Sequence, residues 1–132
     1  MLYLVPTPIG NLRDITLRAL DVLKQSDVIL CEDTRQTQKL LTDHGISGPL
    51  QSFHEHSGPA RLQQVMEMLR EGKTLALVSD GGMPAISDPG FELVRECLRE
   101  GIRAEALPGP SAVIPALAAS GLATDAFSFF GF

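Results

Sequence analysis

The sequence predicts an α/β domain with a five-stranded, mainly parallel sheet and helices on both faces. Short apolar runs and helical segments alternate five times along the chain, which is the pattern of a parallel α/β sheet. The 132 residues suffice for about one domain. Loops rich in glycine and proline follow several strand candidates, at the edge where α/β proteins place their ligand sites.

The strand candidates are short runs of mostly apolar residues, each bounded by turn-forming or polar residues. Continuous apolar runs of this length are typical of strands that are buried on both faces. The five runs are residues 1–5, 27–31, 50–53, 74–78 and 103–107.

Three helices are predicted between the first four strands. They span residues 15–25, 34–44 and 57–71. The third is the clearest, because its apolar residues recur at positions i, i+3, i+4 and i+7. These residues are Leu62, Val65, Met66 and Leu69. Gly45 and Gly72 follow the second and third helices at the position that glycine favours.

The fourth helix is predicted over residues 88–100, with Asp88 as its cap and Pro89 at its first position. Its apolar face is expected to consist of Phe91, Val94 and Leu98.

The fifth helix is predicted over residues 110–120, and Pro115 is expected to bend or break its last turns. The aromatic segment 127–132 that follows is too apolar to lie in water. It is expected to pack as a last strand or to lead into a further part of the protein.

Composition excludes several classes. The net charge of −5 argues against a broad nucleic-acid-binding surface, so an RNA role requires a local basic patch or another part of the protein. No apolar run approaches the roughly 18 residues of a membrane span, and the first residues lack a basic signal-peptide region. Cys31 and Cys97 are isolated, which indicates reduced thiols in a cytoplasmic protein without a metal site. The common nucleotide-binding glycine motifs are absent from the sequence.

The loop over residues 78–90 is the strongest indication of a ligand site. It combines two adjacent glycines, two prolines and two aspartates directly after an apolar strand. Such residues form a sharp loop that exposes its backbone. The alternative is a plain strand-to-helix connection, which normally needs fewer residues.

Two polar groups follow other strands. Glu32, Asp33 and Arg35 lie at a strand-to-helix junction, where they are expected to bind a substrate or deliver a base. The alternative is a helix start whose acids favour the helix dipole. His54 and His56 are spaced to share one face of an extended segment. A metal site would need a third ligand, so surface histidines are the favoured interpretation.

The turn at Pro108-Gly109-Pro110-Ser111-Ala112 precedes a helix of small residues. Free amides and small side chains there would let a ligand approach closely. The alternative is a tight turn with Pro110 at the first helical position.

Taken in order, these motifs resemble the tetrapyrrole methylase superfamily, and within it the methyltransferases of small-subunit ribosomal RNA. The matching segments are Val5–Leu20, Glu32–Arg35, His54–His56, Ser79–Gly90 and Pro108–Ala112. The resemblance implies transfer of a methyl group from S-adenosylmethionine to a cytidine ribose 2′-hydroxyl. It also implies a ribosomal RNA partner, a homodimer, and no membrane or metal.

The resemblance also assigns candidate residues. The cofactor cleft is expected to be lined by residues of three loops: Pro8, Ile9, Gly10, Asp80, Gly82, Met83, Ile86, Ser111 and Ala112. The substrate side, with any catalytic role, is expected to hold Glu32, Asp33, Arg35 and His54.

Two departures from the family pattern matter. Gly81 and Met83 stand where the family usually has alanine and threonine, so a hydroxyl is lost. The family also has a second α/β domain, so residues 1–132 are expected to be the amino-terminal domain and to supply half of the cleft. A tetrapyrrole or corrin methyltransferase and a non-catalytic binding or dimerisation domain remain as alternative functions.

Overall fold

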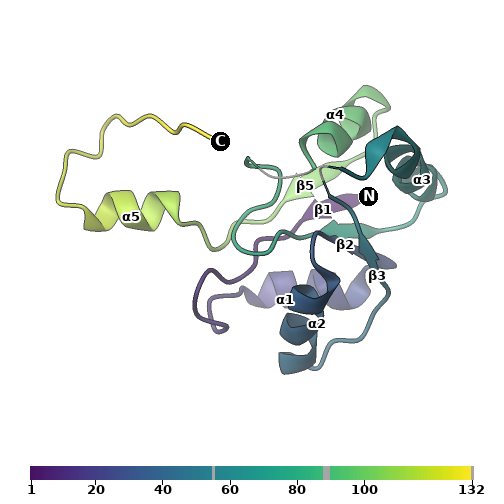
Figure 1. The fold of residues 1–132 in the computed structure, drawn as a ribbon, viewed down its shortest axis with the longest axis horizontal. Coiled ribbons are helices and arrows are strands. Elements are labelled where there is room, and N and C mark those ends of the chain that lie inside the picture. The colour runs from purple at the N-terminus through teal and green to yellow at the C-terminus, as the bar shows by residue number, and fades with distance from the viewer. Residues whose placement is uncertain (55, 88–89, 132) are drawn as a thin grey trace.

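The computed structural model describes residues 1–54, 56–87 and 90–131. Five strands and five helices alternate along the described chain, as predicted (Figure 1). They are β1 (Leu2–Leu4), α1 (Leu17–Gln25), β2 (Val28–Cys31), α2 (Thr34–Asp43), β3 (Leu50–Ser52), α3 (Gly58–Arg70), β4 (Leu75–Leu77), α4 (Phe91–Arg99), β5 (Ala104–Ala106) and α5 (Val113–Ala119). Among these helices, none has the length and apolar character needed to cross a membrane.

The sheet has the strand order β3-β2-β4-β1-β5, and every pair of neighbours is parallel. β1 lies inside the sheet, because Leu2 is in register with Leu75 of β4 on one side and with Ala104 of β5 on the other. All strands therefore end at one edge of the sheet, where the loops that follow them meet. This arrangement confirms the predicted fold class.

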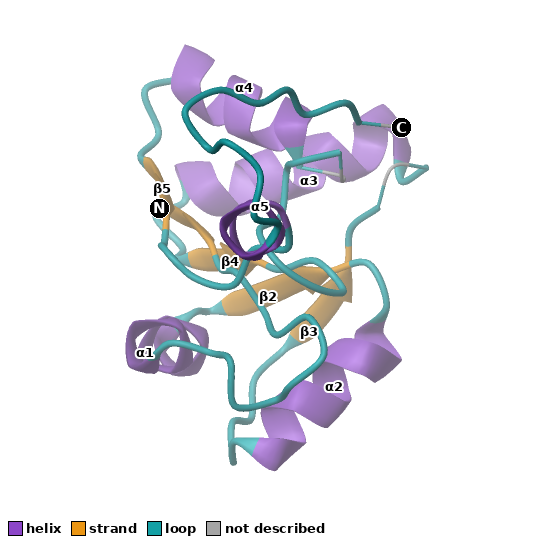
Figure 2. Ribbon diagram, turned by 90° about the vertical axis from the view of Figure 1, so that its left-hand side faces the viewer, coloured by secondary structure: helices purple, strands orange, loops and turns teal. Residues whose placement is uncertain are grey.

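Helices cover both faces of the sheet, with α3 and α4 on one face and α1 and α2 on the other (Figure 2). Successive strand residues point to opposite faces. One face contributes the buried residues Leu2, Leu4, Leu30, Leu75 and Leu77, which pack with Val65, Met66, Leu69, Leu93 and Cys97. The other contributes Val5, Ile29, Cys31, Ala76 and Val78, which pack with Ala19, Val22, Leu23 and Leu41. Burial raises the pKa of both thiols, that of Cys97 to about 11.

Of the predicted apolar face of α4, only Val94 packs against the core, where it is partly buried. Leu93 and Cys97 are fully buried, whereas Phe91 and Leu98 are 62% and 68% exposed. Cys97 behaves as a small apolar residue, and with Leu93 it forms an i, i+4 stripe that the sequence pattern did not count. Gly90 occupies the cap position of α4 with φ 116°, while Asp88 and Pro89 lie outside the described residues.

α5 begins three residues later than predicted, so Pro110 is not its first residue. Pro115 consequently falls in the first turn, where a missing N–H costs no intrahelical hydrogen bond. The expected break is therefore absent. α5 buries none of its residues and projects from the sheet (Figure 1). Residues 120–131 are exposed and form no strand, and Phe132 lies outside the described residues.

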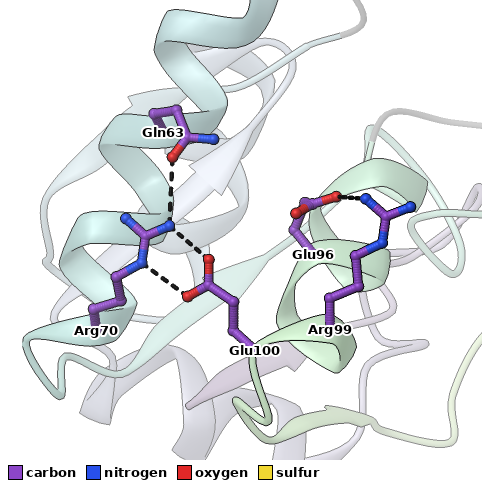
Figure 3. Close-up of polar contacts among 5 residues, drawn as sticks. All are labelled: Gln63, Arg70, Glu96, Arg99 and Glu100. Carbon is purple, nitrogen blue, oxygen red and sulfur yellow. Dashed lines mark hydrogen bonds and ion pairs between the residues drawn. The ribbon is translucent and has the colours of Figure 1, made fainter.

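The ends of α3 and α4 are joined by polar side chains (Figure 3). The Arg70 guanidinium donates to both carboxylate oxygens of Glu100, at 2.8 and 2.6 Å, and Arg99 pairs with Glu96 at 2.6 Å. The hydrogen bonds from Arg70 lower the pKa of Glu100. Both partners are partly exposed, so this pair orients the helices more than it stabilises the fold.

Candidate functional site

The loops that follow β1 and β4 are fastened to each other at the carboxyl edge of the sheet. The Thr7 and Gly82 backbones exchange two hydrogen bonds, at 3.1 and 2.8 Å. The Thr7 hydroxyl donates to the Ser79 carbonyl at 3.1 Å, and the Ser79 hydroxyl donates to the Gly82 carbonyl at 3.1 Å. The two loops therefore hold each other in place through the protein's own hydrogen bonds.

Gly82 is the point where three loops meet. Its φ of +79° lies in the left-handed region, which side chains other than glycine rarely adopt. A Cβ built there would lie 3.5 Å from Ile9 Cγ2 and 3.7 Å from the Pro110 carbonyl oxygen. In the loop after β5, a Cβ on Gly109 would overlap Pro6 Cγ, so the Gly109 backbone lies directly against the Pro6 ring. The loops after β1, β4 and β5 thus converge as predicted.

The β4 loop also contains strained backbone. Ala85 and Ser87 have φ values of 68° and 52°, which are uncommon for residues with a side chain. Each such residue costs on the order of 1–3 kcal/mol and persists where its surroundings impose it, often next to ligands. This geometry agrees with a loop that is shaped for binding.

The predicted cofactor residues are spread over this convergence of loops. Ile9 and Ile86 expose 45% and 54% of their surface, and Gly10 and Asp80 are also exposed. Pro8 and Ser111 are half-buried, and Ala112 is exposed just before α5. Met83 packs partly on the core of the α3–α4 face. The resemblance led to the expectation of a hydroxyl at this position, where Met83 instead makes an apolar contact with the core.

Asp33 caps the start of α2. Its Oδ1 accepts a 2.9 Å hydrogen bond from the Arg35 backbone, and this bond is the first cause that lowers the pKa of Asp33. The Arg35 side chain is 88% exposed and approaches Asp33 only at 3.5 Å. Glu32 is half-buried at the same junction. The structure thus supports the helix-start interpretation for Asp33 and leaves the Arg35 guanidinium available.

His54 and His56 are both exposed, and their rings are in edge contact with centroids 6.4 Å apart. The rings meet although His56 lies in a turn and not in the extended segment that was expected. In the part of the chain that the structure describes, no group of three potential metal ligands occurs. Glu55, between the two histidines, lies outside the described residues.

A pocket of about 230 Å³ opens beside the fastened loops. Thr7, Pro8 and Leu12 line it from the β1 side, and Ser79 and Asp80 line it from the β4 loop. Only Pro8 and Asp80 of these residues were predicted from the sequence as site residues.

The remaining wall of this pocket, hereafter the α2 pocket, comes from one face of α2. The residues are Gln36, Thr37, Lys39, Leu40 and Asp43. Sequence reasoning missed them, although their i, i+3, i+4 and i+7 spacing identifies a helix face. α2 and α4 lie on opposite faces of the sheet and lead to β3 and β5 at its two sides. The chain therefore leaves the neighbouring strands β2 and β4 toward opposite faces of the sheet. Open α/β sheets bind their ligands at such a point.

Known proteins resemble this chain along its whole length. It is 54% identical to the ribosomal RNA small subunit methyltransferase I of Halalkalibacterium halodurans, over 99% of this chain and 45% of that protein. The Thermotoga maritima protein of that name is 53% identical, over 99% of this chain and 59% of its own length. The chain thus spans about half the length of the curated relatives that it matches.

Solved structures share the fold. The uroporphyrin-III-C-methyltransferase of Thermus thermophilus superposes with a TM-score of 0.66 at 29% identity, over 92% of this chain and 53% of that chain. A cobalamin biosynthetic enzyme, cobalt precorrin-4 methyltransferase, superposes with a TM-score of 0.67 at 27% identity, over 90% of this chain and 49% of that chain. The family model of the tetrapyrrole (corrin/porphyrin) methylases matches residues 1–128. Together with the five-stranded fold and the converging loops, this match shows that the chain belongs to the tetrapyrrole methylase family.

Proposed function

We propose that this chain supplies one half of the active cleft of an enzyme that methylates a cytidine ribose 2′-hydroxyl in small-subunit ribosomal RNA. The observation that carries the proposal is the convergence of three loops around Gly82 at the carboxyl edge of the sheet. Relatives that are 53–54% identical are named as methyltransferases of this RNA, which supports the choice of substrate.

S-adenosylmethionine is the proposed cofactor, and it supplies a sulfonium methyl group when bound. The three loops fit such a molecule, because they combine exposed apolar side chains, Ile9 and Ile86, with backbone that approaches closely at Gly82. Methyl transfer to a hydroxyl depends mainly on alignment, which loops that fasten each other provide. Glu32 and His54 are the candidate bases for the ribose hydroxyl, and Arg35 is the candidate phosphate ligand.

The experiment that tests this function is a methylation assay with the full-length protein and labelled S-adenosylmethionine. Small ribosomal subunits that lack the modification and uroporphyrinogen are offered in parallel. Label on a cytidine ribose of the RNA supports the proposal. Label on the tetrapyrrole alone would replace it with the second candidate, which the structural likeness at 27–29% identity favours. Label on neither would favour a non-catalytic binding or dimerisation domain.

We further propose that residues 1–132 form the amino-terminal domain of a two-domain cytoplasmic protein that functions as a homodimer. α5 buries none of its residues, and Ile114, Leu122, Phe127, Phe129 and Phe130 are all more than half exposed. Apolar surface of this kind suits burial against another domain or subunit. Light scattering on the full-length protein tests the dimer.

If half of the cleft lies in a second domain, the isolated residues 1–132 will bind S-adenosylmethionine poorly. A cofactor cleft that loses one wall loses contacts and the exclusion of water. Calorimetry on the isolated domain and on the full-length protein gives both affinities. A low micromolar Kd for the isolated domain, roughly −8 kcal/mol, would contradict the two-domain cleft.

Arg35→Ala in the full-length protein is expected to weaken binding of small ribosomal subunits several-fold and to leave the affinity for S-adenosylmethionine unchanged. The guanidinium is 88% exposed and only loosely paired with Asp33, so it is available to a phosphate. Arg99→Ala is the matched control, because Arg99 lies at the other end of the fold and pairs with Glu96. Equal subunit affinities for Arg35→Ala and wild type would remove Arg35 from the site.

A further inference from the structure

The α2 pocket contains polar groups that have no partner within the domain. Among the described residues, the side chains of Gln36, Lys39, Asp43 and Asp80 make no hydrogen bond or ion pair. All four line a pocket next to the fastened loops of the candidate site. A ligand that paired with these side chains would not have to displace hydrogen bonds or ion pairs within the protein.

The volume of the α2 pocket limits what can enter it. Pockets that enclose whole ligands measure roughly 300–1,000 Å³. At about 230 Å³, this pocket admits one part of a larger molecule and not an entire cofactor. Its apolar wall, which includes Pro8, Leu12 and Leu40, suits a flat ring.

The charges in the α2 pocket select the chemistry of that ring. Asp43 and Asp80 are acceptors and disfavour an anion inside the pocket. Carboxylates accept from the exocyclic amine of cytosine. Lys39, which lies between Gln36 and Asp43 along α2, supplies the positive charge that a backbone phosphate needs.

We propose that the α2 pocket receives one unstacked cytosine base of an RNA strand, with Asp43 accepting from its exocyclic amine and Lys39 contacting the adjacent phosphate. Sequence-specific RNA recognition typically reads such splayed-out bases. The inference rests on the proposed function and assigns a part of its substrate to α2. It also explains how an acidic domain with a net charge of −5 contacts RNA, namely through a few placed groups.

The test measures binding of ten-nucleotide oligocytidylate and oligouridylate to the full-length protein by fluorescence anisotropy. Wild type is expected to prefer oligocytidylate, and Asp43→Asn is expected to reduce that preference by roughly fivefold or more, since one good base contact is worth about 1–3 kcal/mol. Lys39→Gln is expected to weaken the binding of both oligomers equally. It should also reduce the slope of log affinity against log salt concentration by about 0.7, the value for one single-strand phosphate.

Matched controls are Asp21→Asn and Lys24→Gln on α1, which are exposed and outside the α2 pocket. Asp43 lies at the end of α2, where a negative charge opposes the helix dipole, so its replacement by asparagine will not unfold the domain. Equal affinity of wild type for both oligomers, or an unchanged preference in Asp43→Asn, would overturn the inference. Ribosomal methylation by wild type is measured in parallel. If methylation is absent while the preference for oligocytidylate is intact, the proposed function is overturned and the inference about the α2 pocket still holds.

Discussion

Gly82→Val in the full-length protein is expected to lower kcat/KM for ribosomal methylation at least about a hundredfold, the scale of loss when reacting groups are displaced by about 1 Å. Valine cannot adopt the φ of +79° without strain, and its Cβ would contact Ile9 and the Pro110 carbonyl. The hydrogen bonds between Gly82 and Thr7 pass the displacement on to the β1 loop. Initial rates of methyl transfer measure the loss.

Gly82→Val will also lower stability, since a strained backbone costs on the order of 1–3 kcal/mol. Gly101→Val separates the two effects. Gly101 has a similar φ of +69°, has no heavy atom within 4 Å of a built Cβ, and follows α4 at the opposite edge of the sheet. We expect the two variants to melt at similar temperatures and only Gly82→Val to lose activity. Wild-type activity in Gly82→Val would exclude the β4 loop from the cleft.

Leu93→Ala is expected to destabilise the domain by about 2–5 kcal/mol, the usual cost of truncating a buried leucine. Leu93 is fully buried and packs into the core of the α3–α4 face. Leu98→Ala on the same helix is expected to change stability by less than about 0.5 kcal/mol, because Leu98 is 68% exposed. Urea unfolding of both variants measures the difference.

The comparison between Leu93→Ala and Leu98→Ala also decides which face of α4 meets the sheet. The two substitutions are chemically identical and lie on one helix, so helix propensity cancels. A larger loss for Leu98→Ala would restore the apolar face that the sequence pattern predicted and contradict the packing of Leu93 and Cys97.

The inner strands were predictable because they are short apolar runs, as the fully buried Val28–Cys31 illustrates. The edge strands β3 and β5 are only partly buried. The stripe of α3 was predictable for a similar reason, since Leu62, Val65, Met66 and Leu69 fit only one helix face. α4 offered two overlapping stripes, and its correct face depended on treating Cys97 as an apolar residue. The position of Pro115 in the first turn depended on the start of α5, and helix boundaries are weakly encoded in local sequence.

The candidate site was predictable only in part. Glycine and proline mark the loops after β1, β4 and β5, and these loops do converge at Gly82. The wall that Gln36, Lys39 and Asp43 provide arises from the strand order, which places α2 beside loops that are distant in sequence. No local pattern specifies that order. Asp33 shows the converse case, because its acidic side chain at a strand end proved to cap α2.

The interior position of β1 has a consequence for how this domain is made. Leu2 gains a neighbour on one side of its strand only once Leu75 is made, and on the other side only once Ala104 is made. At about 5–20 residues per second, a ribosome needs roughly 5–20 s to synthesise the hundred residues in between. Throughout that interval, at least one side of the strand that holds Leu2 and Leu4 lacks its neighbour. The centre of the sheet therefore closes late in translation, and contacts so distant along the chain are slow to form. The earliest segment of the newborn chain is also the one that most needs shielding from aggregation until β5 has emerged.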